Sequence, residues 1–319
     1  MEEIQHRGIV DQELSGQRLD QALARLFSDY SRSRLQRWIK AGRVRVDGEV
    51  RKPRDKVWKG EHIVLRAVLE SEQYCGPEDI PLDILYEDEH LLVMDKPAGL
   101  VVHPGSGNPG GTVQNALLHH DPGLAGLPRA GIVHRLDKDT TGLMVVARSP
   151  VAHKRLVEAL QARNIKREYL ALVVGRPTAG GEVDAPVGRH PGKRVCMAVV
   201  PGGKPARTHY RINERFRIHS LLDVRLESGR THQIRVHMAH IRYPLVGDAV
   251  YGGRLKLPRN ASEATKAVLR TFPRQALHAR RLSLQHPVTG DALVWESPVP
   301  ADLQALIDQL REDAAEHAG

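Results

Sequence analysis

Apolar residues in the larger, C-terminal part of the chain occur as short continuous runs separated by stretches of helical periodicity. Continuous runs of this length are typical of strands that are buried on both faces. They lie at Leu91–Met94, Leu143–Ala147 and Leu170–Val174. Helices are predicted to alternate with the strands at residues 152–163 and 301–311. The pattern therefore predicts a body that mixes strands and helices.

The N-terminal part has a different pattern, which predicts a small α+β module. Leu35, Trp38 and Ile39 have the i, i+3 and i+4 spacing of one face of a helix. Asp47-Gly48 then lies between valines, and this dipeptide strongly favours a two-residue hairpin. Val50, beyond the turn, is expected to continue the hairpin opposite Val44 and Val46.

Composition shifts along the chain predict five segments. An acidic stretch with glycine and two prolines predicts a linker at residues 69–83. It separates the small module at 17–68 from the large body at 84–312. Residues 1–16 are expected to form an N-terminal tail, and residues 313–319 a frayed C-terminus.

Positive charge is concentrated in the small module. The chain has 47 Lys and Arg against 38 Asp and Glu, a net charge of +9, and residues 17–66 alone hold 14 basic against 6 acidic residues. Such a basic segment favours a polyanionic partner, either RNA or DNA. The candidate contact residues lie on the helix and strand, off the apolar stripe: Arg32, Arg34, Arg37, Lys40, Arg43 and Arg45.

Composition also excludes several classes of protein. No apolar run approaches the ~18 residues of a membrane span, and the N-terminus has no signal-peptide pattern. Two cysteines are too few for a disulfide scaffold or a four-cysteine zinc site. We therefore expect a cytoplasmic protein without membrane contact. No segment has the pattern of an exposed apolar interface, so we expect a monomer.

The most distinctive segment is a polar loop between two apolar strands, at residues 131–147. It contains Asp137 and Asp139 together with basic and hydroxyl side chains. A rigid sheet that presents a charged loop is a common way to position a catalytic group. Chemistry alone does not choose between the two aspartates.

A second candidate segment runs from a strand into a helix at residues 226–240. Arg230 and Thr231 lie at the start of this helix, where free amide groups favour an anion. The histidines of the segment match no standard metal-ligand spacing. Residues 105–110 have the spacing of a dinucleotide-binding loop, but Pro109 disfavours the helix that such a loop requires. We therefore expect no metal and no other cofactor.

These segments together resemble the RNA pseudouridine synthases of the RluA type. Residues 17–66 resemble an S4 RNA-binding domain. The resemblance implies an α+β fold, with a mainly antiparallel sheet in a catalytic domain and a small N-terminal S4 domain. In the catalytic domain it rests on HRLDKDTTGLMVVA (134–147), KPAGLVVHP (96–104), REY (167–169), GRTHQIRVH (229–237) and HIRYPLVGDAVYGG (240–253).

The resemblance implies an isomerase that converts specific uridines to pseudouridine without a cofactor. The enzyme breaks the N1–C1′ bond of the nucleotide and rejoins the base through C5. Asp137 matches the essential aspartate of the family, either as a nucleophile at C1′ or as the base that removes the 2′ proton. Arg235 matches the arginine that pairs with it, and Arg230 is the second candidate. Tyr169 matches the tyrosine that stacks on the uracil.

The remaining site residues and the substrate also follow from the resemblance. Arg135 matches an arginine that holds the place of the flipped-out nucleotide, and His134, Arg230 and Thr231 are expected to contact the substrate. The resemblance is closest to members that modify 23S rRNA of the large ribosomal subunit. It points to the stem-loop of helix 69, with the large-subunit precursor as the partner.

Three alternatives remain open at the level of the sequence. Asp137 and Asp139 in one loop also suit a nucleoside-cleaving glycosidase, which would release free uracil. A non-catalytic RNA-binding or ribosome-assembly protein would depend on the basic module alone. A sibling synthase would perform the same reaction at another rRNA or tRNA site.

Overall fold

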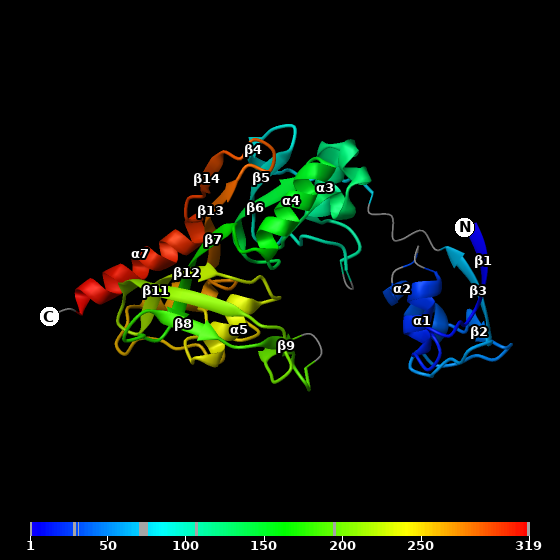
Figure 1. Cartoon of the computed structure of the whole chain (residues 1–319). Coiled ribbons are helices and arrows are strands. Elements are labelled where there is room, and N and C mark those ends of the chain that lie inside the picture. The colour runs from blue at the N-terminus through cyan, green and yellow to red at the C-terminus, as the bar shows by residue number, and fades with distance from the viewer. Residues whose placement is uncertain are drawn as a thin grey trace. The chain divides into compact units, whose positions relative to one another are not determined.

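The computed structural model describes residues 2–27, 30, 32–69, 76–105, 108–193 and 196–317; for residues 2–4, 32–34 and 67–69 only the backbone is described. The chain forms two compact units, which meet in sequence between Tyr74 and Cys75 (Figure 1). This boundary lies inside the predicted linker.

The first unit packs two helices on a small antiparallel sheet with the strand order β1-β3-β2. Its core is formed by Leu19, Leu23, Leu35, Ile39, Val44, Val46, Ile63 and Leu65, all fully or almost fully buried. The elements are β1 (Glu2–Ile9), α1 (Leu19–Leu26), α2 (Arg32–Lys40), β2 (Val44–Val46) and β3 (His62–Leu69).

Two predictions for this unit need correction. Residues 1–16 do not form a free tail, because β1 pairs with β3 along its whole length and satisfies that strand's outer edge. The turn at Asp47-Gly48 forms as predicted, with positive φ angles of 49° and 85°. However, β2 then pairs with β3, whose Ile63 and Leu65 complete the core, and Val50 remains 53% exposed.

The second unit is built on a mixed, mainly antiparallel sheet. Its described strands have the order β4-β5-β6-β13-β7-β12-β11-β8, with β14 paired to β13. β6 and β13 run parallel. The strands of this sheet are β4 (Asp83–Glu87), β5 (Leu91–Lys96), β6 (Thr141–Ala147), β7 (Lys166–Val174), β8 (Gly181–Asp184), β11 (Arg207–Arg215), β12 (His219–Leu226), β13 (Leu277–Gln285) and β14 (Ala292–Glu296).

Helices and short connections cover this sheet. Two further short strands, β9 and β10, pair with each other in an antiparallel arrangement. These elements are α3 (Val113–His120), the 3₁₀ turns η1 (Pro122–Gly126) and η2 (Pro128–Gly131), α4 (Pro150–Gln161), β9 (Val187–Arg189), β10 (Met197–Val199), α5 (Gln233–His240), α6 (Glu263–Thr271) and α7 (Ala301–Glu316).

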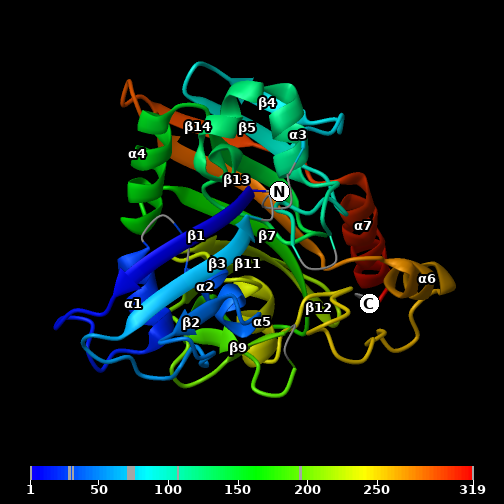
Figure 2. The same ribbon diagram turned by 90° about the vertical axis from the view of Figure 1, so that its right-hand side faces the viewer.

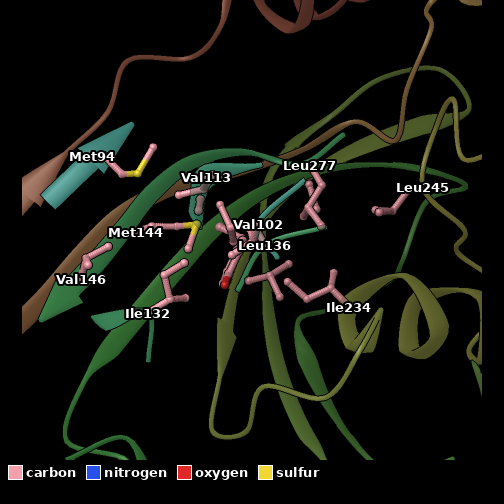
Figure 3. Packing of buried hydrophobic residues seen from close by; sticks show 14 of the residues in the cluster. Met94, Val102, Val113, Ile132, Leu136, Met144, Val146, Ile234, Leu245 and Leu277 are labelled. Carbon is pink, nitrogen blue, oxygen red and sulfur yellow. The ribbon is translucent and has the colours of Figure 1, made fainter. Parts of the chain in front are cut away.

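The apolar runs of the sequence form central strands that are buried on both faces, as predicted. On β7, Leu170 and Leu172 pack with α6 and α7, whereas Tyr169 and Ala171 belong to the cluster on the opposite face. That opposite cluster also includes residues from α3, α5 and both 3₁₀ turns. Figure 3 shows Leu136, from the polar loop, among side chains of this cluster that come from other elements. The loop is therefore anchored in the core by its own leucine.

Two predicted boundaries of the large body also need correction. The C-terminus remains helical to Glu316 (Figure 2), and residues 318–319 lie outside the described residues. Buried Asp313 pairs with Arg217 at 2.9 Å and fixes the last turns of α7. The described end of the predicted linker is fixed to the second unit. Glu78 accepts a hydrogen bond from the Gly111 amide at 3.0 Å, and the Gly76 carbonyl accepts one from Asn115 at 2.8 Å.

Candidate active site

A cleft of about 750 Å³ opens beside the polar loop of the second unit. Its walls come from that loop, from the start of β7 and from the segment that joins β12 to α5. The charged side chains that line it are Asp137, Asp184, Glu227, Arg129, Arg135, Arg163, Arg167, Arg207, Arg230 and Arg235. Arginines outnumber carboxylates on these walls, so the cleft suits an anionic ligand.

A buried lysine holds the loop that carries Asp137. The Lys96 side chain at the end of β5 is fully buried, and its ammonium group donates a hydrogen bond to the Lys138 carbonyl at 2.9 Å. It also donates to two carbonyls of its own turn, at 2.6 and 3.0 Å. Burial lowers the pKa of Lys96 to about 8, although the charges of Asp139 and Asp137 oppose this change. One ammonium group thus ties the loop to the sheet.

The far end of the loop is fixed by a close contact between β6 and β13. Gly142 has a φ of 111°, and a Cβ at this position would lie 2.3 Å from the Ala279 carbonyl oxygen. A side chain therefore does not fit without displacing the β13 backbone. Just before this glycine, the Thr140 hydroxyl accepts a hydrogen bond from the Gln275 side chain at 3.0 Å.

Asp137 forms one end of a buried chain of charges. Arg235 Nη1 donates to Asp137 Oδ2 at 3.0 Å, and the same guanidinium donates to both oxygens of Asp248, at 2.7 and 2.9 Å. Burial lowers the pKa of Arg235, but the hydrogen bonds and charges of Asp248 and Asp137 outweigh it and leave the pKa raised. Asp248 accepts two further hydrogen bonds, from the backbone amides of Val250 and Tyr251. The bidentate pair therefore fixes the direction in which Arg235 meets Asp137.

A histidine approaches Asp137 from the other side. His232 Nε2 lies 3.8 Å from Asp137 Oδ1, and His232 Nδ1 lies 2.8 Å from the Tyr251 hydroxyl. That hydroxyl already accepts the Met197 amide hydrogen at 2.9 Å, so its own proton is available to Nδ1. This arrangement favours the tautomer with its proton on Nε2, facing Asp137. Burial lowers the pKa of His232, although the charge of Asp137 opposes this change.

The structure separates the two aspartates of the loop. Asp137 lines the cleft and is 16% exposed, whereas Asp139 is not among the described residues that line it. The carbonyl of Asp139 instead faces the buried Arg274 guanidinium, at 3.4 Å. The structure also separates the two candidate arginines, because Arg230 Nε donates to the Pro205 carbonyl at 3.1 Å and Arg235 takes the carboxylate.

The other predicted contact residues of the catalytic domain line the same cleft. Tyr169 is 6% exposed at its wall, and burial raises the pKa of its hydroxyl. Arg135 and Thr231 are exposed, whereas His134 is half-buried. His134 Nε2 accepts the Val145 amide hydrogen at 3.0 Å, and burial lowers the pKa of the ring to about 3. The neutral ring therefore carries its proton on Nδ1.

The predicted nucleic-acid residues of the first unit divide into two groups. The side chains of Arg32 and Arg34 lie outside the described residues. The other four are exposed on α2, on β2 or between these elements: Arg37, Lys40, Arg43 and Arg45. None of these four forms an ion pair with a carboxylate in the described part of the chain, which leaves their charges available to a ligand.

Sequence reasoning missed Lys96, Asp248, His232, Tyr251 and Arg167 as parts of the site. Each lies in a segment on which the family resemblance rests, so the segments were found but the roles were not. Asp248 and Tyr251 are separated in sequence from the loop that they support. Their contribution depends on contacts that only the folded chain brings together.

The described residues contain neither a metal site nor a membrane-spanning helix. They contain no group of three or more His, Cys, Asp or Glu side chains that is arranged to hold a metal ion. None of the described helices combines the length and the apolar character of a membrane span.

Comparisons with known proteins cover both units. Residues 90–240 match the family model described as RNA pseudouridylate synthase, and residues 17–63 match the S4 domain. The chain is 59% identical over 315 residues to ribosomal large subunit pseudouridine synthase D of Escherichia coli (strain K12), an alignment that covers 98% of this chain and 97% of the relative.

A second relative and a solved structure agree with this result. The protein of the same name from Xanthomonas campestris pv. campestris is 56% identical over 312 residues, which cover 98% of this chain and 94% of that protein. Among solved structures, human RNA pseudouridylate synthase domain containing 4 superposes with a TM-score of 0.57 at 27% identity, over 72% of this chain and 93% of that one.

Proposed function

This chain belongs to the RNA pseudouridylate synthase family, and we propose that it converts specific uridines of large-subunit rRNA to pseudouridine, with Asp137 as the catalytic carboxylate. The names of the two bacterial relatives support the choice of substrate. The observation that carries the catalytic assignment is the ion pair of 3.0 Å between Asp137 and Arg235 at the wall of the cleft.

Asp137 has the position and the partners that the reaction requires. Whether a carboxylate attacks C1′ or removes the 2′ proton, it must meet the ribose at a fixed angle. Arg235 holds one oxygen of Asp137, and the second oxygen faces His232 across 3.8 Å. Asp248 holds Arg235 in turn, so the carboxylate is positioned before the substrate binds.

The cleft accepts a nucleotide that has left its stack. The C1′ atom and the edges of a stacked base are inaccessible to a side chain, so the target uridine must flip out of the RNA. We assign Arg135 to the place that this nucleotide vacates, since it is exposed and lies two residues before Asp137. Tyr169 provides the ring on which the flipped uracil stacks. His134, Arg230 and Thr231 contact the same nucleotide or its phosphates.

The first unit supplies affinity for the RNA. Its exposed basic side chains on α2 and β2 neutralise phosphates, a contribution that depends steeply on salt. The target loop is the stem-loop of helix 69 in 23S rRNA, encountered in the large-subunit precursor. Unpaired loop nucleotides suit this assignment, because sequence-specific RNA recognition mostly uses bases outside a helix.

The first test measures tritium release from 23S rRNA that lacks modifications and carries tritium at uridine C5. Formation of the new C–C bond expels the C5 hydrogen, so release reports the reaction directly. We expect release by the wild type, none by Asp137→Asn, and nearly full release by the matched control Asp139→Asn. Equal release by the two aspartate variants contradicts the role of Asp137.

The substrate is tested with the same preparation. The new pseudouridines are mapped by carbodiimide labelling and primer extension, and we expect them in the helix 69 loop. Release from tRNA and not from 23S rRNA supports the sibling synthase instead. Binding of 23S rRNA without release from either RNA supports the RNA-binding alternative, and free uracil in the supernatant supports a glycosidase.

A further inference from the structure

Arg167 is a buried cation for which the described part of the chain offers no counterion. It lies on β7 two residues before Tyr169, on the same face of the strand, and it lines the cleft. The residue is 8% exposed, and its Nε atom is buried without a hydrogen-bond partner. Among the described residues, no side chain forms an ion pair or hydrogen bond with its guanidinium.

Other buried arginines of this unit are compensated. Arg235 meets two carboxylates, and Arg274 forms a bidentate pair with Asp302 at 2.7 and 2.8 Å. A buried and unpaired charge is strongly unfavourable unless a ligand supplies the opposite charge. The exception at Arg167 therefore points to negative charge that the substrate brings to this position or develops there.

The backbone around Arg167 leaves room for its guanidinium. A Cβ at Gly229 would lie 2.9 Å from Arg167 Nη1, so the absence of a side chain at Gly229 allows the guanidinium to occupy this position. Gly229 does not require a positive φ. The need for glycine at position 229 is therefore explained by the adjacent Arg167 guanidinium and not by the backbone conformation of Gly229.

A second unpartnered donor lies in the same wall. The Nδ1 atom of His134 is buried and has no hydrogen-bond partner among the described residues. Its proton is fixed there, because Nε2 accepts the Val145 amide hydrogen. After burial, the positive charge of Arg167 is the next cause that lowers the pKa of His134. Arg167 and His134 thus both have a donor without an acceptor in the wall of the cleft that contains Tyr169.

The depth of these donors selects the part of the substrate. Phosphates of a bound RNA remain at the rim, where Arg135 is exposed, whereas a flipped base enters furthest. Uracil presents carbonyl oxygens at O2 and O4. When its N1–C1′ bond breaks heterolytically, both bonding electrons stay with the base, and the negative charge spreads from N1 to these oxygens.

We propose that Arg167, with His134, binds the carbonyl oxygens of the flipped uracil and stabilises the uracil anion formed when the N1–C1′ bond breaks. The electron deficit at C1′ is met by Asp137, through a bond to its carboxylate or through loss of the 2′ proton to it. The anion then forms the C5–C1′ bond while the bond between Asp137 and C1′ breaks or, on the other route, while Asp137 returns the 2′ proton. The C5 proton leaves to solvent, and N1 takes up a proton. The negative charge that faces Arg167 is therefore largest while the base is an anion. Other sites that stabilise developing charge work in the same way.

The test compares Arg167→Met and Arg167→Lys with the wild type under single-turnover conditions with saturating RNA. Loss of one preorganised donor to a developing anion lowers rates by about 10²–10³-fold. We expect this loss of tritium release for Arg167→Met, partial recovery for Arg167→Lys, and dissociation constants within twofold of the wild type. Arg281→Met is the matched control, because it removes a half-buried arginine that pairs with Glu296 on the same sheet.

A change of leaving group separates a chemical role from a structural one. Fluorine at C5 stabilises the uracil anion, so N1–C1′ cleavage of RNA with 5-fluorouridine depends less on Arg167. We expect the defect of Arg167→Met in this cleavage to be at least tenfold smaller than its defect with uridine. A defect of equal size with both bases overturns the proposal.

Gly229→Ala provides a second variant that keeps the charge. The new methyl group displaces the end of the Arg167 side chain, and we expect a rate between those of the wild type and Arg167→Met. This variant carries the test if Arg167→Met does not fold. A rate equal to that of the wild type then overturns the proposal.

The inference rests on the proposed function, and the two fail in different ways. If the wild type releases no tritium from any RNA, the proposed function fails. If the wild type reacts and Arg167→Met reacts within threefold of it, this inference alone fails. A third result is that Arg167→Met binds RNA with a larger dissociation constant, an unchanged rate and a salt slope reduced by about one. This result assigns Arg167 to a phosphate of the RNA backbone and overturns its role at the base.

Discussion

Asp248 shows how much of the site depends on residues that the substrate does not touch. Its carboxylate is buried and accepts four hydrogen bonds, two from Arg235 and two from backbone amides. Burial raises the pKa of Asp248, but its hydrogen bonds and the charge of Arg235 outweigh it and leave the pKa lowered. Asp248 therefore stays charged and keeps Arg235 directed at Asp137.

Replacement of Asp248 by asparagine tests this support. We expect tritium release at saturating RNA to fall at least tenfold, because Arg235 loses its fixed direction. Removal of one partner from a buried ion pair also costs about 3–5 kcal/mol in the free energy of unfolding, measured by urea titration. Asp313→Asn is the matched control, since Asp313 is equally buried against Arg217 but lies on α7. An equal loss of rate in the control contradicts the specific role of Asp248.

Secondary-structure elements carry the two functions of the chain separately. In the second unit, the paired strands β6 and β13 lie so close together at Gly142 and Ala279 that the loop before β6 leaves the sheet at a fixed point. In the first unit, α2 and β2 present arginines whose backbones are ordered by a separate core. We therefore expect variants of the first unit to affect RNA affinity and not the chemical step.

The double variant Arg37→Ala/Arg43→Ala measures the contribution of the first unit. Each lost phosphate contact reduces the slope of log affinity against log salt by about one, so we expect a reduction of about two. The rate of tritium release at saturating RNA should stay within twofold of the wild type. Arg311→Ala, which removes an exposed arginine of α7, serves as the control. An unchanged salt slope in the double variant contradicts phosphate binding by this unit.

Across the whole molecule, buried and half-buried neutral histidines link stability to pH. Burial lowers the pKa of His219 to about 4, and His103 and His134 are lowered to about 4 and about 3. Unfolded histidine binds its proton near pH 6.5. Between these values the unfolded chain holds more protons, so stability falls as the pH falls from 6.5 towards 4.

His219→Leu removes one of these contributions. The His219 side chain is 1% exposed and neither ring nitrogen has a partner among the described residues. From linkage, one such histidine accounts for about 2 kcal/mol of the unfolding free energy lost between pH 7 and pH 5. We expect the variant to lose about that much less than the wild type in urea titrations at the two pH values. His240 is exposed, so His240→Leu should lose as much unfolding free energy between pH 7 and pH 5 as the wild type. A loss in His219→Leu equal to that of the wild type contradicts the assignment.

The sequence by itself determined the parts of this protein that depend on local pattern. Apolar runs located the central strands, helical spacing located α2, α4 and α7, and charge located the basic module. The polar loop between two buried strands was recognisable as a candidate site for the same reason. The strand, helix and loop signals are each contained in fewer than about twenty neighbouring residues, and the charge signal lies within residues 17–66, so no knowledge of the fold was needed.

The tertiary structure alone decided which residues meet. β1 became a strand because β3 offered it an open edge, and the C-terminal turns stayed helical because Arg217 reaches Asp313. The contact between Asp137 and Arg235, which lie 98 residues apart in the sequence, distinguished Asp137 from Asp139 and Arg235 from Arg230. Burial of Arg167 without a partner among the described residues is likewise a property of the folded chain. Charge pairing and burial are properties of three-dimensional neighbourhoods, and a linear pattern does not contain them.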